Sequence, residues 1–288
     1  MDKIKHTIAM SGASGFVGSN LGSAFRKMKW KVVPLGRNDF TSGLLAEKMT
    51  GADVIINLAG APIIKRWSAE YKKTMYESRI NITKSLVSAC SQMDPKPKLF
   101  ISTSAIGYYA SGGPHTENNH VKADNFLGRL ALDWEKEALR AKEFGIRTVI
   151  FRFGVILGKD GGALKEMLAP FKLGMGGTIG DGSQPFSWVH IEDLIRAFQK
   201  AVNDESFQDI YNLTSPHPTT NKGLTKALGK ALGKPTFMKI PKFAIRLQLG
   251  EGAQVLTEGQ TVIPERLIKS GFSFTFNDIE EAVKDCVT

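Results

Sequence analysis

The glycine run Gly12-Ala13-Ser14-Gly15-Phe16-Val17-Gly18 constrains the fold of this chain more than any other feature. It follows a strand-like apolar stretch and opens a helical segment, which is the context that a dinucleotide-binding turn requires. Gly12 would allow the tight turn, Gly15 would let the backbone approach a pyrophosphate, and Gly18 would permit close helix–strand packing, while free amides at the helix start favour phosphate. We therefore expect a cofactor at this turn, contacted by Gly12, Ser14, Gly15, Phe16, Val17 and Gly18.

The first 213 residues alternate short β-rich runs with helical stretches. Strands are predicted at 6–10, 31–35, 53–58, 98–103, 146–153 and 209–213. Helices are predicted at 15–28, 67–93, 123–144 and 190–202. This alternation is typical of crossover connections between parallel strands. It predicts an α/β fold of the Rossmann type, with a doubly wound parallel sheet.

The pattern changes after Phe153. A glycine-rich turn spans 158–162, and residues 174–185 are dense in glycine with few helix formers, which favours a substrate loop region over more sheet. From Pro216 onward, short helices and the Phe-rich segment 272–276 indicate a small C-terminal α/β domain. We expect a dinucleotide-binding domain over 1–215, in which 154–186 contributes to the substrate lobe, and a small domain over 216–288.

Charge and cysteine content narrow the class of protein. The formal net charge is +10, but Lys and Arg are dispersed, and no nucleic-acid motif is present, so a solvated basic surface is expected. Cys90 and Cys286 are far apart and lack a His cluster, which indicates neither disulfides nor a metal site. The first ten residues do not resemble a signal peptide, and Arg152 interrupts the apolar run 148–157. We expect a cytoplasmic protein without nucleic-acid or membrane partners.

The end of the second predicted strand indicates which cofactor would bind. In an NAD site, an Asp or Glu about twenty residues past the glycines accepts a hydrogen bond from the ribose 2′-hydroxyl. This chain has Gly36-Arg37-Asn38 instead, and a guanidinium can pair with a 2′-phosphate. We therefore predict NADP(H), with Arg37 as the discriminating residue. Asp39 keeps the alternative open, because a small loop shift would bring its carboxylate to a ribose.

Several further motifs follow in a fixed order along the chain. They are Asn57-Leu58-Ala59-Gly60, Ser78-Arg79-x-Asn81, Ser102-Thr103-Ser104-Ala105 and Trp188-Val189-His190-Ile191-Glu192-Asp193-Leu194. With the glycine run, they make the chain resemble the extended short-chain dehydrogenase/reductase superfamily. Gly107-Tyr108-Tyr109, Asp133-Trp134-Glu135 and Ile263-Pro264-x-Arg266 narrow the resemblance to an atypical, epimerase-like branch with its own C-terminal domain. Members of that branch are commonly labelled NADP-dependent oxidoreductases or sugar-nucleotide epimerases, and some carry a cell-division label.

The resemblance implies which residues line the cofactor. Carried over residue by residue, the family pattern adds Gly36, Arg37, Asn38, Leu58, Ala59, Gly60, Arg79 and Ser102 to the glycine turn. Ser104 matches the substrate-positioning serine of the superfamily, although a role in capping the turn explains it equally well. The superfamily often dimerises through its two long helices, here 67–93 and 123–144, which implies a homodimer.

The catalytic pair of the superfamily is absent from this sequence. Active members use Tyr-x-x-x-Lys, in which the Lys and the cationic nicotinamide lower the tyrosine pKa from about 10 toward working pH. The residues four after the five tyrosines here are Met75, Ile80, Gly112, Gly113 and Ser215. Counting along the helix, the Tyr position falls near Leu127 and the Lys position near Ala131. If chemistry occurs, Tyr108 or Tyr109 is the nearest proton donor, so the candidate catalytic residues are Ser104, Tyr108 and Tyr109.

Two functions of different classes follow from these observations. The first is an NADP(H)-dependent oxidoreductase or epimerase of a small molecule, with nucleotide-linked compounds among its candidates and a non-standard proton donor. The second is a catalytically degenerate NADPH-binding sensor or interaction protein, for which a cell-division role rests on family labels. Arg66, Trp67, Gln184, Phe186 and Trp188 are candidate pocket-lining residues. His190, beside Asp193 at a helix start, is expected to make a structural hydrogen bond.

Overall fold

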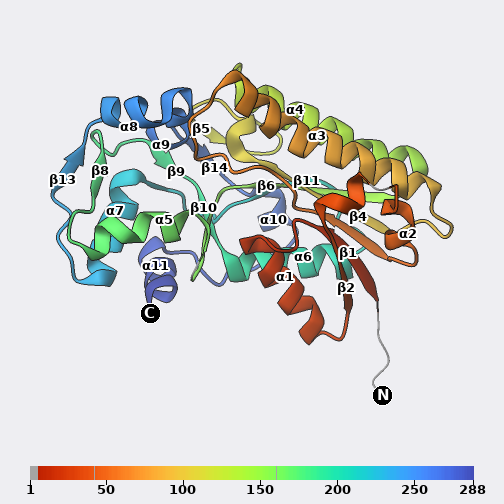
Figure 1. The fold of residues 1–288 in the computed structure, drawn as a ribbon. Helices are drawn as coiled ribbons and strands as arrows, with labels where there is room; N and C mark the ends of the chain where they lie inside the picture. The colour runs from red at the N-terminus through yellow and green to blue at the C-terminus, as the bar shows by residue number, and fades with distance from the viewer. Residues whose placement is uncertain (1–5, 42, 160) are drawn as a thin grey trace.

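A six-stranded parallel sheet forms the centre of the molecule in the computed structural model, which describes residues 6–41, 43–159 and 161–288 (Figure 1). Its strands are β1 (Thr7–Ser11), β2 (Lys31–Leu35), β3 (Val54–Asn57), β4 (Leu99–Ala105), β6 (Arg147–Phe153) and β11 (Asp209–Leu213). They run in the order β11-β6-β4-β3-β1-β2. The chain therefore leaves β1 toward opposite sides of the sheet, which creates a crevice at the carboxyl ends of β1 and β3. The predicted Rossmann-type fold is confirmed.

Helices cover both faces of this sheet (Figure 1). On one face lie α1 (Phe16–Lys27) and α6 (Ile191–Asn203), and on the other α2 (Leu45–Met49), α3 (Ala69–Gln92) and α4 (Phe126–Leu139). Ile8 and Met10 of β1 pack in the first core, whereas Ala9 packs in the second, because successive side chains of a strand point to opposite faces. Strands buried on both faces explain the continuous apolar runs of the sequence.

A second lobe is built from short elements around Trp188. Its helices are α5 (Gly162–Lys172), α7 (Asn221–Leu232) and α11 (Ile279–Val287). Three strand pairs complete it: β7 (Val155–Leu157) with β10 (Trp188–His190), β9 (Pro185–Phe186) with β12 (Thr219–Thr220), and β8 (Gly177–Ile179) with β13 (Met238–Ile240). The glycine-rich stretch expected as a loop thus contains strands β8 and β9.

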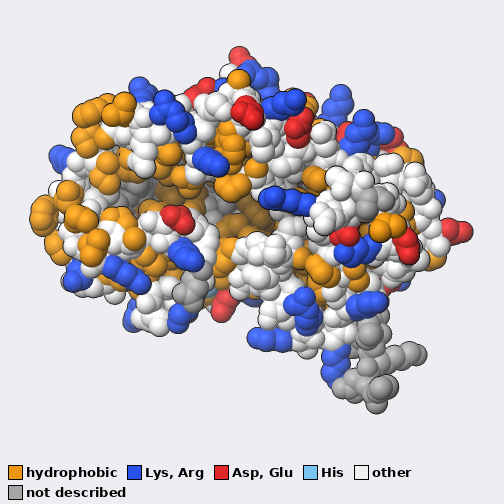
Figure 2. All heavy atoms as spheres, in the orientation of Figure 1, with side chains coloured by type: hydrophobic (Ala, Val, Ile, Leu, Met, Phe, Trp, Pro, Cys, Tyr) orange, Lys and Arg blue, Asp and Glu red, His pale blue; other side chains and the backbone are white. Residues whose placement is uncertain are grey.

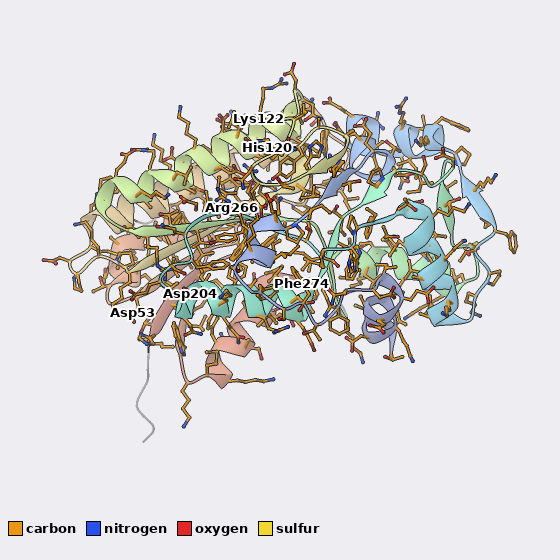
Figure 3. The ribbon with its side chains drawn as sticks, turned by 180° about the vertical axis from the view of Figure 1, so that it is seen from behind. Asp53, His120, Lys122, Asp204, Arg266 and Phe274 are labelled. Atoms are coloured by element: carbon orange, nitrogen blue, oxygen red, sulfur yellow. The ribbon has the colours of Figure 1, made fainter. Side chains whose placement is uncertain are left out.

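The C-terminal residues return to the cofactor-binding half. After α8 (Lys242–Leu249), the 3-10 helix η4 (Gly250–Ala253) and α9 (Gln254–Thr257), strand β14 (Gln260–Val262) pairs with β5 (Gly112–His115), and α10 (Glu265–Lys269) follows. Asn212 at the end of β11 donates to the Ile263 carbonyl at 3.1 Å, and Thr214 donates to that of Val262 at 3.1 Å. Arg266, labelled in Figure 3, donates from its guanidinium to the Ile210 carbonyl of the edge strand β11 at 3.1 Å. The segment 260–267 therefore packs against the edge strand β11 of the central sheet. The division of the chain at residue 215 stays a prediction.

The helix predicted at 123–144 has different bounds in the structure, and capping residues explain the difference. The predicted helix 123–144 begins at Phe126, because the Asn125 side chain accepts a hydrogen bond from the Gly128 amide. It continues after Leu139 as the 3-10 helix η3 (Arg140–Phe144), and Gly145, with φ +76°, ends it. A shorter 3-10 helix, η2 (Ile106–Tyr108), follows β4. None of the helices in the described ranges is long and apolar enough to cross a membrane.

Candidate cofactor and active site

The glycine turn has the geometry that its sequence predicts. Gly12 has φ +67°, and a Cβ there would lie 2.7 Å from the Leu58 carbonyl oxygen, so this position requires glycine. A Cβ at Gly18 would lie 2.3 Å from the Gly12 carbonyl oxygen, which shows how closely α1 packs on the turn. Helix α1 begins after Gly15, without a side-chain cap or an acidic residue in its first turn. Its N-terminal end is therefore suited to an anion.

Arg37 and Asp39, the two candidate contacts to the cofactor ribose, both lie in the segment after β2 but differ in their surroundings. It is the 3-10 helix η1 (Arg37–Phe40), preceded by Gly36. The Asp39 carboxylate accepts from the Gly36 amide at 2.6 Å and from Lys48 Nζ at 2.8 Å, and these contacts hold the Asp39 pKa below its usual value. Arg37 and Asn38 are exposed, and Arg37 forms no ion pair with any carboxylate in the described ranges. Arg37 is thus the side chain free to meet a phosphate, whereas Asp39 is engaged locally.

The segment after β3 places Leu58, Ala59 and Gly60 against the glycine turn and against Arg79. A Cβ at Gly60 would lie 3.1 Å from the Arg79 guanidinium, which donates to the carbonyls of Met75 and Ala61 and lies 5.3 Å from the Trp134 ring. Burial lowers the pKa of Arg79 to about 10. None of the carboxylates that the structure describes forms an ion pair with it. A desolvated cation without an acidic partner favours an anionic ligand at this crevice.

Ser102, predicted to contact the cofactor, lies in a buried polar cluster beneath the crevice. Asn57 at the end of β3 accepts from Ser11 Oγ at 2.7 Å and donates to Thr83 Oγ1 at 2.8 Å. Its Nδ2 also lies 3.4 Å from Ser102 Oγ. Trp134 Nε1 donates to the same Thr83 oxygen at 3.0 Å. These contacts join β1, β3, β4, α3 and α4 and fix the strand ends from which the crevice is built.

Ser104, the candidate positioning serine, belongs to a buried charged network. Its hydroxyl donates to Glu135 Oε1 at 2.6 Å, and Arg152 binds the same carboxylate through Nε and Nη2, both at 2.7 Å. All three side chains are buried, with at most 4% of each exposed. Although burial alone would lower the pKa of Arg152, hydrogen bonds and charge attraction from Glu135 outweigh it and raise that pKa. The Ser104 hydroxyl is thereby oriented toward the protein interior.

The two candidate tyrosines differ in what they can do. Tyr109 is fully buried; its hydroxyl accepts from Arg152 at 2.7 Å and donates to Asn212 at 2.7 Å, and burial raises its pKa to about 12 despite the nearby Arg152. Tyr108 is 5% exposed, and the Arg152 guanidinium lies 3.5 Å above its ring. No hydrogen bond ties the Tyr108 hydroxyl to another described group. The geometry therefore favours Tyr108 over Tyr109 as a proton donor.

The positions of the missing Tyr and Lys are apolar in space as well as in sequence. Leu127 packs against Gly107, where a Cβ would lie 3.3 Å from the Leu127 Cβ, and it belongs to an apolar cluster with Trp67, Met75 and Val255. Ala131 shares a second cluster with Tyr108, Tyr109 and Val262. Tyr108 therefore packs beside Ala131, the position at which the family pattern predicts the lysine.

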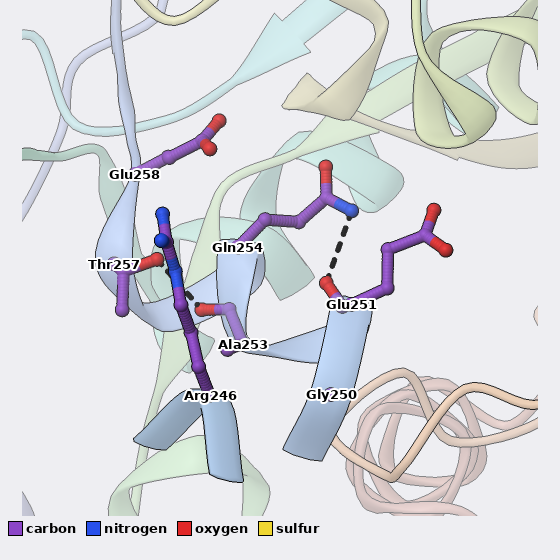
Figure 4. A pocket seen from close by; sticks show the side chains of 7 residues that line it. All are labelled: Arg246, Gly250, Glu251, Ala253, Gln254, Thr257 and Glu258. Atoms are coloured by element: carbon purple, nitrogen blue, oxygen red, sulfur yellow. Dashed lines mark hydrogen bonds between the residues drawn. The ribbon is translucent and has the colours of Figure 1, made fainter. Parts of the chain in front are cut away.

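A polar pocket of about 360 Å³ lies between the C-terminal helices (Figure 4). It is lined by Arg246, Gly250, Glu251, Ala253, Gln254, Thr257 and Glu258. Three contacts connect its lining residues to the cofactor-binding half: Lys72 with Glu251, Ser111 Oγ with Glu258 at 2.9 Å, and Asn125 Nδ2 with Gln254 Oε1 at 3.3 Å. Beside the pocket, Arg66 donates to the Leu247 carbonyl at 2.9 Å. Trp67 packs nearby with its Nε1 donating to the Ile63 carbonyl. The loop predicted to line a pocket therefore lies beside one.

The remaining candidates lie deeper in the second lobe. Gln184 donates to the carbonyls of Ile179 and Leu256, and Phe186 and Trp188 pack in the core of that lobe. His190 caps α6 by accepting from the Glu192 amide, its ring centroid lies 3.8 Å from that of the tilted Phe276 ring, and its Nε2 is 3.3 Å from Asp285. Asp193 instead accepts from the amides of Thr275 and Phe276. These five side chains hold the lobe together.

Sequence reasoning overlooked the charged pair that organises this site. In the sequence, Arg152 interrupts an apolar run, and Glu135 belongs to the Asp133-Trp134-Glu135 motif, but neither pattern indicates that the two residues pair. A charge within a run that is buried on both faces requires a partner, and a glutamate on the inner face of the preceding helix, here Glu135 of α4, is the partner to search for. No cluster of three metal-ligating side chains occurs in the described part of the chain.

Comparisons with known proteins agree with this geometry. The model of the NAD dependent epimerase/dehydratase family matches residues 8–214, and a domain of unknown function, DUF1731, matches residues 240–286. The chain is 34% identical to the chloroplastic epimerase family protein SDR39U1 homolog of Arabidopsis thaliana, covering 96% of this chain and 86% of that protein. It is also 34% identical to the epimerase family protein YfhF of Bacillus subtilis, covering 97% of each.

A solved structure extends the likeness over the whole fold. The human epimerase family protein SDR39U1, determined with NADPH, superposes with a TM-score of 0.92 at 30% identity, covering 97% of this chain and 98% of that one. The family expected from the glycine run, the Asn57-Leu58-Ala59-Gly60 segment and the motif around Ser104 is thus confirmed. The chain belongs to the NAD dependent epimerase/dehydratase family, in the branch whose members carry a C-terminal DUF1731 domain.

Proposed function

We propose that the chain binds NADP(H) in the crevice between β1 and β3 and acts there as an oxidoreductase or epimerase of a small molecule. The observation that carries this proposal is the pairing of an uncapped α1 N-terminus with two cations, Arg37 and Arg79, that have no acidic partner in the described structure. A dinucleotide phosphate neutralises such groups. The backbone of the glycine turn and of Leu58, Ala59 and Gly60 would contact the dinucleotide.

NADP(H) is favoured over NAD(H) by the side chains after β2. Arg37 is exposed and available for a 2′-phosphate, while Asp39 is held by Gly36 and Lys48 and would have to break both contacts to accept from a ribose. The human relative of similar fold was determined with NADPH, which supports the same choice. In titrations, wild type is expected to bind NADPH more tightly than NADH, and Arg37→Ala to remove that difference. Equal affinities in wild type would contradict the proposal.

For the reaction, we assign the proton donor to Tyr108. A bound nicotinamide would supply or accept a hydride. The Tyr108 hydroxyl would give a proton to the substrate oxygen or take one from it, and the Arg152 guanidinium 3.5 Å above the ring would hold the ring in position. The polar pocket of Figure 4 would hold the non-reacting end of the substrate, for which a nucleotide-linked sugar is our leading candidate.

The second candidate function is an NADPH-binding sensor or interaction protein without turnover. The specific observation that favours it is the enclosure of Ser104, Glu135, Arg152 and Tyr109 in a network whose polar groups satisfy one another. Leu127 and Ala131 cannot transfer a proton. A site of this kind would retain cofactor affinity after the chemistry had been lost.

One experiment separates the two functions. NADPH consumption, and product formation for a redox-neutral epimerisation that leaves the cofactor unchanged, are followed against a panel of carbonyl compounds and nucleotide sugars, with Tyr108→Phe, Tyr109→Phe and Ser104→Ala beside wild type. If the protein is an enzyme, Tyr108→Phe should lower the turnover rate by about 10²-fold or more, which is the typical contribution of a general acid. The affinity of this variant for NADPH should be unchanged. Tyr109→Phe should mainly affect stability. NADPH binding without turnover across the panel would support the sensor.

A further inference from the structure

Basic charge is concentrated in one part of the chain. Residues 210–250 contain no Asp or Glu, but they contain seven basic residues, Lys222, Lys226, Lys230, Lys234, Lys239, Lys242 and Arg246. This stretch therefore accounts for most of the net charge of +10. In the structure these basic residues lie on α7, β13 and α8 and on the turn between α7 and β13. Of its seven cations, Lys230 forms an ion pair, with Glu280, and no other is paired with a carboxylate that the structure describes.

The same region exposes large apolar side chains. Phe237 is 80% exposed, Phe243 73% and Leu247 78%. Met238 and, from the segment after α5, Leu173 and Met175 are also exposed. Pairing of β13 with β8, in which Met238 lies opposite Gly177, brings these two segments alongside each other. We call these six apolar residues, together with Lys234, Lys239, Lys242 and Arg246, the C-terminal patch.

Helix α8 is the part of the patch that most needs a partner. None of its eight residues is buried, and Phe243 and Leu247, four residues apart, lie on one face of the helix. Figure 2 shows orange apolar side chains gathered over the end of the molecule that carries α8 and β13, with blue cations among them. Soluble proteins rarely expose contiguous apolar surface of this kind unless something covers it.

We propose that the C-terminal patch docks the protein on an anionic phospholipid surface. Aromatic and aliphatic side chains beside several Lys and Arg are the combination that binds the interface of an acidic bilayer, where the apolar groups enter and the cations meet the headgroups. A second copy of this chain fits poorly, because it would bring two basic surfaces together. Nucleic acid would use the cations but not Phe237, Phe243 and Leu247. Asp181, the acidic residue facing Lys242, is already engaged by Ser183.

The patch also adjoins the polar pocket of the C-terminal helices. Arg246 belongs to both, and the Leu247 carbonyl accepts from Arg66 of the loop after β3. A protein docked through Phe243 and Leu247 would therefore hold this pocket close to the membrane surface. The peripheral contact proposed here requires no membrane-spanning helix, and it departs from the sequence-based expectation of a protein without a membrane partner.

The test is co-sedimentation with vesicles of phosphatidylcholine, with and without phosphatidylglycerol, at low and high salt. Wild type should pellet with the anionic vesicles at low salt and be released by salt. Each of Lys239→Gln and Lys242→Gln should weaken binding about fivefold, since one surface cation contributes about 1 kcal/mol. Phe243→Ser and Leu247→Ser should weaken it about tenfold or more. Lys96→Gln and Val121→Ser, which alter exposed residues outside the patch, should bind as wild type does.

A spectroscopic arm tests insertion directly. The four native tryptophans are buried, with at most 7% exposed, so Phe243→Trp adds the one solvent-exposed indole. Its emission should shift to shorter wavelength on anionic vesicles. The proposal is overturned if wild type ignores anionic vesicles, binds neutral ones equally, binds without this shift, or forms dimers that the patch variants abolish. NADPH affinity should be unchanged in all variants, which keeps this test separate from the proposed function.

Discussion

Replacing Arg152 by Met tests whether the Ser104–Glu135–Arg152–Tyr109 network is structural. The change removes two hydrogen bonds to Glu135 and one to Tyr109, and it leaves the Glu135 carboxylate, 4% exposed, without a cation. Breaking a buried ion pair from one side costs about 3–5 kcal/mol. We expect the free energy of unfolding to fall by that amount, measured by urea denaturation monitored through tryptophan fluorescence.

The matched double variant makes the reasoning quantitative. In Glu135→Leu/Arg152→Met both charges are absent, and the remaining cost is the Ser104 hydroxyl left without its acceptor, about 1–3 kcal/mol. The double variant should therefore be more stable than Arg152→Met alone, and the two sites should couple by about 2 kcal/mol or more. A loss below about 1 kcal/mol in Arg152→Met, or additive losses in the double variant, would refute the account.

Three further predictions concern the turn, the lobe contact and the buried tyrosine. Gly12→Ala should lose NADPH binding, and its free energy of unfolding in urea should be lower than that of Gly51→Ala by at least about 1 kcal/mol. Both glycines have positive φ, but only a Cβ at Gly12 would meet the Leu58 carbonyl, so equal losses of stability would contradict this prediction. Burial lowers the pKa of His190, so the stability of wild type should fall as the pH drops below about 6.5. His190→Asn, which can still cap α6, should not show this loss, and parallel stability–pH curves for the two proteins would contradict the prediction. Tyr109→Phe should lower the unfolding free energy by about 1–3 kcal/mol and leave NADPH affinity unchanged, and a loss of affinity would indicate a direct role in the site.

The sheet and the cofactor crevice could be predicted because their signals are local. Strands 31–35 and 209–213 have the expected bounds, and Gly12 to Gly18 form the expected turn. The strand alternation and the turn each depend on residues within a few positions of one another. The engagement of Asp39 by Lys48 was not predictable, because it depends on a side-chain contact across nine residues.

The second lobe was harder to predict because its contacts are distant in sequence. Helix α5 begins at Gly162 and contains Pro170, both poor helix formers, and it is stabilised by packing against α7. The pairing of β5 with β14 joins Gly112 to Gln260 and His115 to Val262, which are far apart in the chain, and leaves no local pattern. The pocket around Arg246 likewise brings together α8, η4 and α9, whose arrangement follows from tertiary packing.

The return of residues 260–267 to the sheet has a consequence for how this chain can be divided. Val262 and Leu267 are fully buried, and the carbonyls of Val262 and Ile263 accept from Thr214 and Asn212. A fragment ending near residue 215 would expose the surface that these residues cover. Protease cleavage in the exposed turn after α7 should instead leave two pieces that remain bound and migrate as one particle until denatured. We therefore expect that the two halves must be expressed as one chain and that they unfold in a single transition.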